Sequence, residues 1–123
     1  MEVRVRQEGG ADIVEIAGEV DLFSSPEVRK ALLSLAKKRS PVIIVDLARV
    51  SYMDSSGLAT LIEGLQMTGA HQGKFKLAAP REEVLEVFEL TRLVDVFEIH
   101  DNVAQALASL RPGGDGRAQV DMR

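Results

Sequence analysis

The sequence predicts a small single-domain α/β fold, with a mixed sheet of four or five strands and about four helices packed mainly on one face. Residues 42–45 (VIIV) form an unbroken apolar run, typical of a strand buried on both faces of a partly parallel sheet. Beyond this run, strand-like segments alternate with helical apolar spacing, which indicates parallel strands joined by helical crossovers. The 123 residues, 46% of them hydrophobic, provide enough apolar material for one core.

The chain is predicted to open with a β-hairpin. In residues 3–5 (VRV) valines alternate with a charged residue, which is the period of a half-buried strand near a sheet edge. Residues 9–10 (GG) are a turn signal, and residues 13–16 (IVEI) supply the second strand. We expect Gly18 to end this strand and residues 19–21 to form a loop at its far end.

A first helix is expected after this loop. Ser24 or Ser25 is its candidate N-cap, and Ser24 with Glu27 has the spacing of a capping box. Pro26 falls in the first turn, where its missing N–H costs nothing. The side chains predicted to face the core are Val28, Ala31, Leu32 and Leu35. Residues 37–39 (KKR) are expected to be a solvated helix end.

The central strand is expected to lead into a second helix. Pro41 marks the entry to the strand, and residues 52–57 (YMDSSG) are expected to link the two elements. Either Asp54 or Ser55 can serve as the N-cap. The helical stripe comprises Leu58, Leu61, Ile62 and Leu65. A hydroxyl at this helix N-terminus is suited to carrying a phosphate, because free N–H groups and the helix dipole favour negative charge.

The last elements are shorter. Residues 75–78 (FKLA) predict a strand, and a short strand near residues 96–99 precedes a helix over residues 103–110. The helix between these strands is expected to begin at Pro80 and to bury Val84, Val87 and Phe88. We place the domain at residues 1–111. Residues 112–123, which hold one proline, three glycines and mixed charge, are expected to be a disordered tail.

Composition argues against several classes of function. A formal net charge of −4, with scattered basic residues, argues against a nucleic-acid surface. The absence of cysteine excludes disulfides and thiol chemistry. With His71 and His100 as the two histidines, expected in a solvated turn and near a helix start, we expect no metal site and no cofactor. No apolar run approaches the roughly 20 residues of a membrane span, and no signal peptide is visible, so we expect a cytoplasmic protein.

Enzyme motifs do not fit the serine-containing segment. A nucleophile elbow needs G-x-S-x-G, and no such run surrounds Ser55. A phosphate-cradling P-loop needs G-x-x-x-x-G-K-[ST], but Lys74 is followed by Phe75. A phospho-aspartate receiver domain, as a family, has a lysine after its last strand, whereas no lysine occurs beyond Lys76. We therefore predict that the protein is not an enzyme.

Chemistry alone leaves the roles of the polar residues open. Ser55 is either a helix cap or a modification site, and Ser56 offers the same hydroxyl one residue later. Asp54 is a cap, a magnesium ligand or an interface charge, and Asp21 is a polar loop residue. The apolar neighbours expected to divide between core and contact surface are Val20, Leu22, Met53 and Leu58.

Four segments, in order, resemble one family. Residues 53–58 (MDSSGL), after a strand and a D-L-x-x-V segment, resemble the signature of STAS domains, specifically of bacterial anti-sigma-factor antagonists. Residues 18–21 (GEVD) resemble that family's first loop, and residues 73–77 (GKFKL) resemble the strand after its signature helix. Residues 88–93 (FELTRL), followed by Val96 and Phe97, resemble its C-terminal segment. The resemblance spans roughly residues 3 to 110.

The resemblance implies a STAS-like fold and a phosphorylation-switched binding protein. The family's phosphorylated serine corresponds to Ser55, and the loop that holds Asp21 lies beside it on the face that meets the partner. Asp21, Asp54, Ser55, Ser56 and Gly57 are therefore the expected partner-binding residues. The expected partners are an anti-sigma factor that is a serine kinase, bound by the unphosphorylated form so that the sigma factor is released, and a protein phosphatase.

Two alternatives keep the fold and change the function. One is a STAS scaffold or regulatory subunit of another assembly, such as a stress-signalling particle or a lipid-transport ATPase complex. The other is a small-molecule or nucleotide sensor, since one fold hosts many functions. The intact D-S-S-G run at residues 54–57 favours the kinase-substrate hypothesis, because a transporter subunit needs no phosphorylatable serine there.

Overall fold

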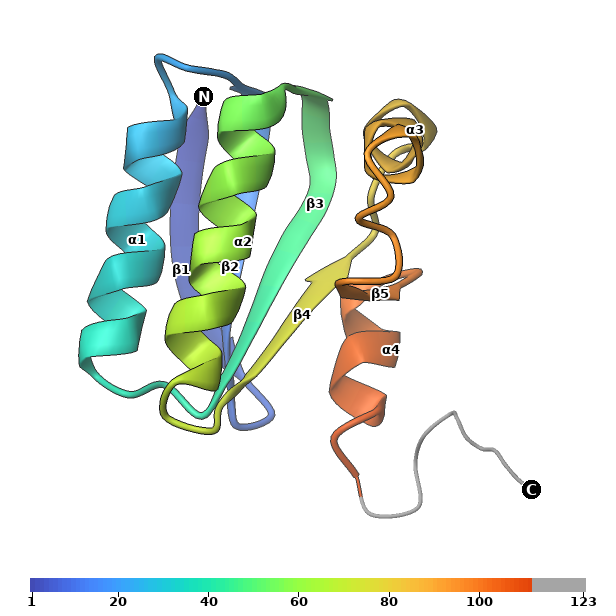
Figure 1. Ribbon diagram of the computed structural model, residues 1–123. Helices are drawn as coiled ribbons and strands as arrows, with labels where there is room; N and C mark the ends of the chain where they lie inside the picture. Colours follow the sequence, from blue (N-terminus) through green and yellow to red (C-terminus); the bar gives the residue numbers. More distant parts are fainter. Residues whose placement is uncertain (112–123) are drawn as a thin grey trace.

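A computed structural model describes residues 1–111, which form one five-stranded sheet in the order β1-β2-β3-β4-β5 (Figure 1). The strands are β1 (Glu2–Glu8), β2 (Ala11–Val20), β3 (Val42–Met53), β4 (Lys74–Ala78) and β5 (Glu98–His100). β1 pairs with β2 in an antiparallel hairpin, and β2 to β5 are parallel to one another. The predicted mixed sheet is confirmed. The expected tail, residues 112–123, lies outside the described residues, so its disorder stays a prediction.

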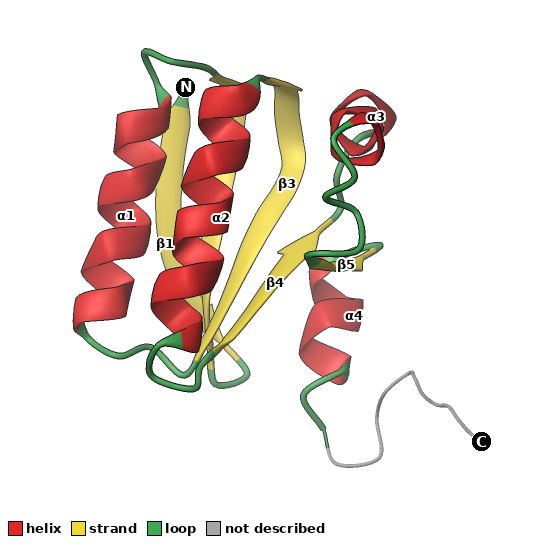
Figure 2. Cartoon of the chain, viewed as in Figure 1, coloured by secondary structure: helices red, strands yellow, loops and turns green. Residues whose placement is uncertain are grey.

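Four helices join and flank the strands, namely α1 (Ser25–Lys37), α2 (Ser55–Gly69), α3 (Glu82–Leu90) and α4 (Val103–Ala108). α1 and α2 lie side by side in front of the β1–β3 part of the sheet (Figure 2). α3 contributes Val84 and Phe88 to the same core, whereas α4 packs Ala106 into a separate cluster with Ile13 and Ile44. Three of the four helices therefore share one core, as predicted.

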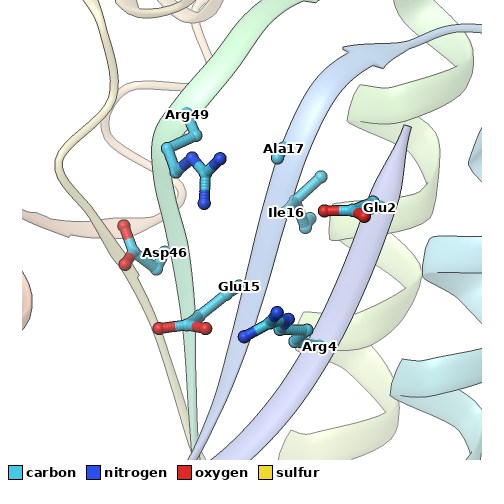
Figure 3. A pocket seen from close by; sticks show the side chains of 7 residues that line it. All are labelled: Glu2, Arg4, Glu15, Ile16, Ala17, Asp46 and Arg49. Carbon is cyan, nitrogen blue, oxygen red and sulfur yellow. The ribbon is translucent and has the colours of Figure 1, made fainter.

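The face of β1–β3 that α1 and α2 leave uncovered carries charged side chains. Because side chains alternate along a strand, Glu15 and Asp46 point away from the face that Val14 and Val45 bury. A small pocket on this face is lined by Glu2, Arg4, Glu15, Ile16, Ala17, Asp46 and Arg49 (Figure 3). This part of the sheet therefore has one face on the core and one face in water, whereas Ile13 and Ile44, nearer the start of β2 and β3, are covered by α4.

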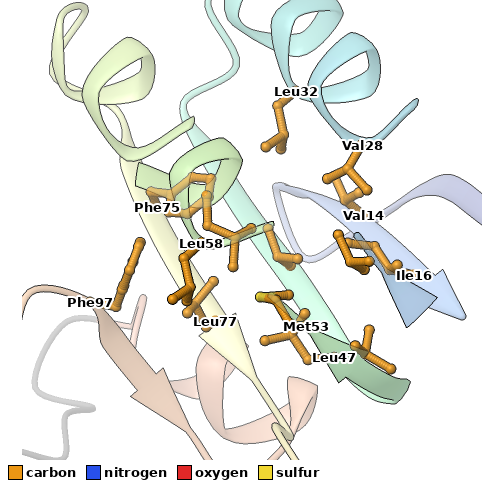
Figure 4. Packing of buried hydrophobic residues seen from close by; sticks show 14 of the residues in the cluster. Val14, Ile16, Val28, Leu32, Leu47, Met53, Leu58, Phe75, Leu77 and Phe97 are labelled. Atoms are coloured by element: carbon orange, nitrogen blue, oxygen red, sulfur yellow. The ribbon is translucent and has the colours of Figure 1, made fainter. Parts of the chain in front are cut away.

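The main core lies between the sheet and the helices. β3 runs through its centre, where Ile43 and Val45 belong to this core and Ile44 belongs to the separate cluster with Ala106. None of the three has exposed surface, which confirms the predicted strand buried on both faces. Around them, Val14 and Ile16 of β2 and Phe75 and Leu77 of β4 pack against helical side chains (Figure 4). The helical side chains of this cluster in α1 and α2 are Val28, Leu32, Leu35, Leu58 and Leu61. Ala31, Ile62 and Leu65, also predicted to face the core, are half-buried.

Both central strands run further than predicted. Gly18 does not end β2; with φ of +107° it lies inside the strand, at one of two places where the register with β3 shifts. Glycine adopts this dihedral angle without strain, so the strand bulges and continues. β3 correspondingly extends to Met53, which pairs with Val20. The expected link over residues 52–57 is therefore wrong, because Asp54 is the single residue between β3 and α2.

The predicted capping box of α1 does not form. Ser24 occupies the N-cap position, but its side chain accepts no hydrogen bond from the helix. The Ser24 hydroxyl instead donates to the carbonyl of Glu19, with 2.7 Å between the oxygens, because the end of β2 lies beside it. Pro26 lies in the first turn of the helix, and residues 37–39 are exposed, both as expected.

His71 lies in the turn after α2 and His100 lies shortly before the start of α4, both as expected, but His71 is less exposed to solvent than predicted. His71 is half-buried, with Nε2 2.7 Å from the carbonyl oxygen of Ser40, so it is not a solvated residue. His100 belongs to β5, and its Nε2 lies 2.6 Å from Oε2 of Glu98, the same oxygen that pairs with Lys76. Burial opposes the charge on Glu98, yet the hydrogen bonds from Lys76 and His100 lower its pKa below the ordinary 4.5.

The first turn of α2 packs directly on the ends of β2 and β3. A Cβ atom added at Gly57 would lie 2.6 Å from Cγ of Met53 and 2.9 Å from Cγ1 of Val20. The N–H of Asp54 also donates to the carbonyl of Val20, with 3.2 Å between the atoms. Only a residue without a side chain lets the helix approach both strands this closely.

We predict that Gly57→Ala destabilises the protein, whereas Gly69→Ala at the other end of α2 does not. The methyl group at position 57 must displace Met53 or Val20, which costs about 1–3 kcal/mol of unfolding free energy. At Gly69 an added Cβ meets nothing within 4 Å. Urea unfolding of both variants checks this, and equal stabilities of the two would contradict the close-packing argument.

Candidate functional site

The sequence-predicted site residues gather at one end of the sheet. The carboxyl ends of β2 and β3 and the N-termini of α1 and α2 all lie there, at the top of Figure 1. Val20 and Met53 are register partners on neighbouring parallel strands. The loop that begins at Asp21 and the segment that begins at Asp54 therefore leave the sheet side by side.

Asp54 is the N-cap of α2. Its backbone is extended, with φ of −107° and ψ of −170°, and its Oδ1 accepts from the N–H groups of Ser56 at 2.9 Å and Gly57 at 3.3 Å. Of the two caps that the sequence allowed, the structure has Asp54. Its carboxylate satisfies two of the otherwise unpaired N–H groups of the first turn. Ser55 is consequently the first residue of the helix and has no capping role.

The hydroxyl of Ser55 is available to another molecule. Ser55 is exposed, whereas Ser56 is half-buried and Gly57 is buried. Among residues 1–111 the Ser55 hydroxyl makes no side-chain hydrogen bond that would have to break before it reacted. The two serines, equivalent by composition, therefore differ in access.

The electrostatic setting of Ser55 combines opposite influences. The helix N-terminus favours negative charge, and the first turn of α2 holds no acidic side chain of its own. The cap Asp54 already brings one carboxylate to this terminus. Added negative charge on Ser55 would thus be tolerated by the helix and would increase the negative charge of the surrounding surface.

Asp21 organises the neighbouring loop. Its Oδ1 accepts from the backbone N–H groups of Phe23 and Ser24, each at 2.9 Å, and its own N–H donates to the Ser24 hydroxyl at 2.9 Å. The N–H of Ser24 is the main cause that lowers the pKa of Asp21 below the ordinary 3.8. Because this pKa is depressed in the folded state, the stabilisation is present above 3.8 and is lost as the pH falls through the lowered value. At neutral pH the carboxylate is charged and holds the loop.

Apolar residues near this edge divide clearly between core and surface. Val20, Met53 and Leu58 are buried, with Met53 and Leu58 pointing into the cluster of Figure 4. Leu22 is 67% exposed, and Phe23, which the sequence reasoning missed, is 89% exposed. The exposure of Phe23 could have been predicted from the apolar pair at residues 22–23, because it lies between Asp21 and the predicted helix start, in a loop where polar residues are the rule.

Neither a metal-binding cluster nor a membrane-spanning helix occurs in the part of the chain that the structure describes. No group of three or more histidine, cysteine, aspartate or glutamate side chains within residues 1–111 is arranged to hold a metal ion. Over the same residues, no helix has the length and hydrophobicity needed to cross a membrane.

Comparison with known proteins adds a family and several relatives. The STAS domain family model matches residues 2–106. The anti-sigma-B factor antagonist of Bacillus subtilis is 36% identical over 97 residues, which cover 79% of this chain and 88% of that protein.

Solved structures with the same fold include an anti-sigma factor antagonist from Mycobacterium paratuberculosis, with a TM-score of 0.83 at 24% identity over 90% of this chain and 94% of that one. The anti-sigma factor antagonist SpoIIAA in its unphosphorylated form has a TM-score of 0.76 at 20% identity, covering 98% and 100%. The phosphorylated form of Bacillus SpoIIAA has a TM-score of 0.71 at 20% identity, covering 89% and 100%.

The resemblance drawn from residues 53–58 and the three other segments is confirmed by these matches. The solved structures superpose well on this one at low sequence identity, so they show a common fold. The family model spans nearly all of the described residues, and the B. subtilis relative covers more than two thirds of the chain. The chain belongs to the STAS domain family.

Proposed function

We propose that this protein is an anti-sigma-factor antagonist that is switched off by phosphorylation of Ser55. In its unphosphorylated form it binds an anti-sigma factor that is itself a serine kinase, and the sigma factor is released. The kinase transfers phosphate from ATP to Ser55, the complex dissociates, and a protein phosphatase resets the switch. The protein is the substrate and antagonist of the kinase rather than an enzyme, and it acts in the cytoplasm with the sigma factor.

One observation carries the proposal: Asp54 caps α2, which leaves Ser55 exposed as the first helical residue. A serine engaged in capping would have to surrender hydrogen bonds on modification, and the helix would be destabilised. Here Asp54 caps the helix, and the neighbouring Ser55 is left to accept the phosphate. The hydroxyl of Ser55 can therefore accept a phosphoryl group while the cap remains in place.

Relatives support the same function. Those with 33–36% identity over about four fifths of this chain are named anti-sigma-B factor antagonists. A solved structural neighbour is described in both an unphosphorylated and a phosphorylated form. The partner-binding surface in this proposal consists of Asp21, Asp54, Ser55, Ser56 and Gly57, of which Gly57 contributes by packing rather than by direct contact.

Electrostatics explains how a phosphate would break the complex. Phosphorylation adds about −1.5 to −2 charges and three acceptor oxygens. The fold tolerates them at a helix N-terminus, but an acidic group of the partner about 5 Å away, at an effective dielectric near 20, opposes binding by roughly 3 kcal/mol. That is about a hundredfold in affinity. The carboxylates of Asp21 and Asp54, at the same end of the sheet as Ser55, add to the negative charge that the partner must approach.

We predict a single phosphoryl acceptor. Incubated with the kinase, Mg²⁺ and ATP, the intact protein should gain one phosphate, Ser55→Ala none, and Ser56→Ala one, because Ser55 is exposed and Ser56 is half-buried. Intact-mass spectrometry followed by peptide mapping makes the measurement. Phosphate on Ser56 or on the buried Thr60 would refute the residue assignment, and an acid-stable, hydroxylamine-labile aspartyl phosphate would favour a receiver mechanism.

We also predict that charge at position 55 weakens binding without unfolding the protein. Ser55→Asp should bind the kinase at least tenfold more weakly, with unchanged circular dichroism and urea midpoint. Gln66→Glu is the matched control, because it adds the same charge on an exposed position of α2 about 16 Å along the helix. Normal binding by Ser55→Asp, equal weakening by Gln66→Glu, or loss of binding through unfolding would each contradict the charge switch.

A further inference from the structure

We propose that Leu22 and Phe23 form an apolar anchor that docks into a pocket of the anti-sigma kinase beside the site of Ser55. This inference rests on the proposed function and adds a second, uncharged component to the binding surface. The anchor is defined as the side chains of these two residues in the loop between β2 and α1.

The anchor is exposed to a degree that packing does not explain. Phe23 is 89% exposed and Leu22 is 67% exposed, although the main core is large enough to bury Phe88 and Phe97. Tyr52, at the neighbouring end of β3, is also half-exposed. Large apolar and aromatic side chains gathered at one edge are characteristic of interaction sites, and aromatic residues are frequent hot spots of binding energy.

The loop that carries the anchor is held in one conformation. Asp21 accepts hydrogen bonds from the N–H groups of Phe23 and Ser24, while Ser24 bonds back to the N–H of Asp21 and to the carbonyl of Glu19. The N–H of Ser25 further donates to the carbonyl of Asp21 at 2.8 Å. The backbone therefore presents Phe23 to solvent in a fixed position. A preorganised anchor loses less conformational entropy on binding than a mobile one.

The anchor lies within one binding footprint of Ser55. Val20 and Met53 are paired across neighbouring strands, so Phe23 and Ser55 follow them by three and two residues. With Cα steps of 3.8 Å and strands about 5 Å apart, the two Cα atoms are at most about 24 Å from each other. A standard interface covers about 800 Å² on each partner, a patch about 30 Å across. One partner can thus contact both.

Charge at this edge favours the kinase over a second copy of the same chain. Residues 19–27 and 51–58 contain the carboxylates of Glu19, Asp21, Glu27 and Asp54 and no basic side chain. Two copies that met here would bring eight carboxylates together, and like charges in an interface oppose association. The pocket that fits is apolar and belongs to a different protein.

The anchor changes the role assigned to Asp21. Its Oδ1 is turned to its own loop, so Asp21 acts on the partner through Phe23 and is a positioning residue. An asparagine at position 21 keeps an acceptor oxygen in the same place and loses the charge. An alanine loses both. The pair of variants therefore separates loop shape from direct charge contact.

The test is titration calorimetry of the anti-sigma kinase, recovered by co-purification with this protein and saturated with a non-hydrolysable ATP analogue so that Ser55 stays unmodified. Phe23→Ala should weaken binding at least tenfold, Leu22→Ala severalfold, and Phe23→Tyr less than threefold, with unchanged urea midpoints because both side chains are exposed. The control Val96→Ala removes a half-exposed apolar side chain from the segment between α3 and β5 and should bind like the unchanged protein. The affinity of Asp21→Asn for the kinase should stay within about threefold of that of the unchanged protein. Asp21→Ala should lose as much affinity as Phe23→Ala.

The outcomes distinguish the anchor from the phosphorylation switch. If Ser55→Asp weakens binding while Phe23→Ala and Leu22→Ala bind normally, the anchor is refuted and the proposed function stands. If the unchanged protein co-purifies with no anti-sigma kinase, both are refuted. A dimer of the unchanged protein that Phe23→Ala dissociates, measured by light scattering, would instead assign the anchor to a second copy.

Discussion

The fold and the candidate site both depend on the close approach of α2 to the ends of β2 and β3. Gly57 makes this approach possible, because any side chain there would collide with Val20 and Met53. The backbone hydrogen bond from the N–H of Asp54 to the carbonyl of Val20 joins the two strand ends next to Gly57. From this contact follow the short connection between β3 and α2, the position of Asp54 as N-cap, and the exposure of Ser55 one residue later.

A rigid site of this kind restricts how a modification can act. The surrounding core is closely packed, and closely packed cores resist small displacements of their side chains. A phosphate on Ser55 would lie at a helix N-terminus whose dipole favours negative charge, while Asp54 keeps its hydrogen bonds to the first turn, so the fold would have little reason to change. The free-energy cost would fall on the complex, whose partner must approach the new charge. In the account proposed here, the anchor of Leu22 and Phe23 supplies affinity and the state of Ser55 decides whether that affinity is sufficient.

Much of this architecture could be predicted from the sequence, and the exceptions have physical causes. A strand buried on both faces imposes a continuous apolar run, so residues 42–45 were identifiable. Whether Gly18 ends a strand or bulges within it depends on pairing with β3, which is not a local property. The same extension left Asp54 alone between β3 and α2 and redirected the Ser24 hydroxyl to Glu19, against the local capping pattern. The domain boundary at residue 111 and the role of Ser55 stay predictions.

Amide hydrogen exchange of the phosphorylated and unphosphorylated protein can show whether phosphorylation changes only the surface around Ser55. We predict altered protection in the 21–24 loop and in residues 55–58, at the end of the sheet that carries the phosphate, and unchanged protection in β3 and in the rest of α2. The unbroken protection of residues 43–45 would show that the buried strand is not disturbed. Loss of protection spreading along β3 or α2 on phosphorylation would contradict a surface switch and would indicate instead that the phosphate acts by loosening the fold.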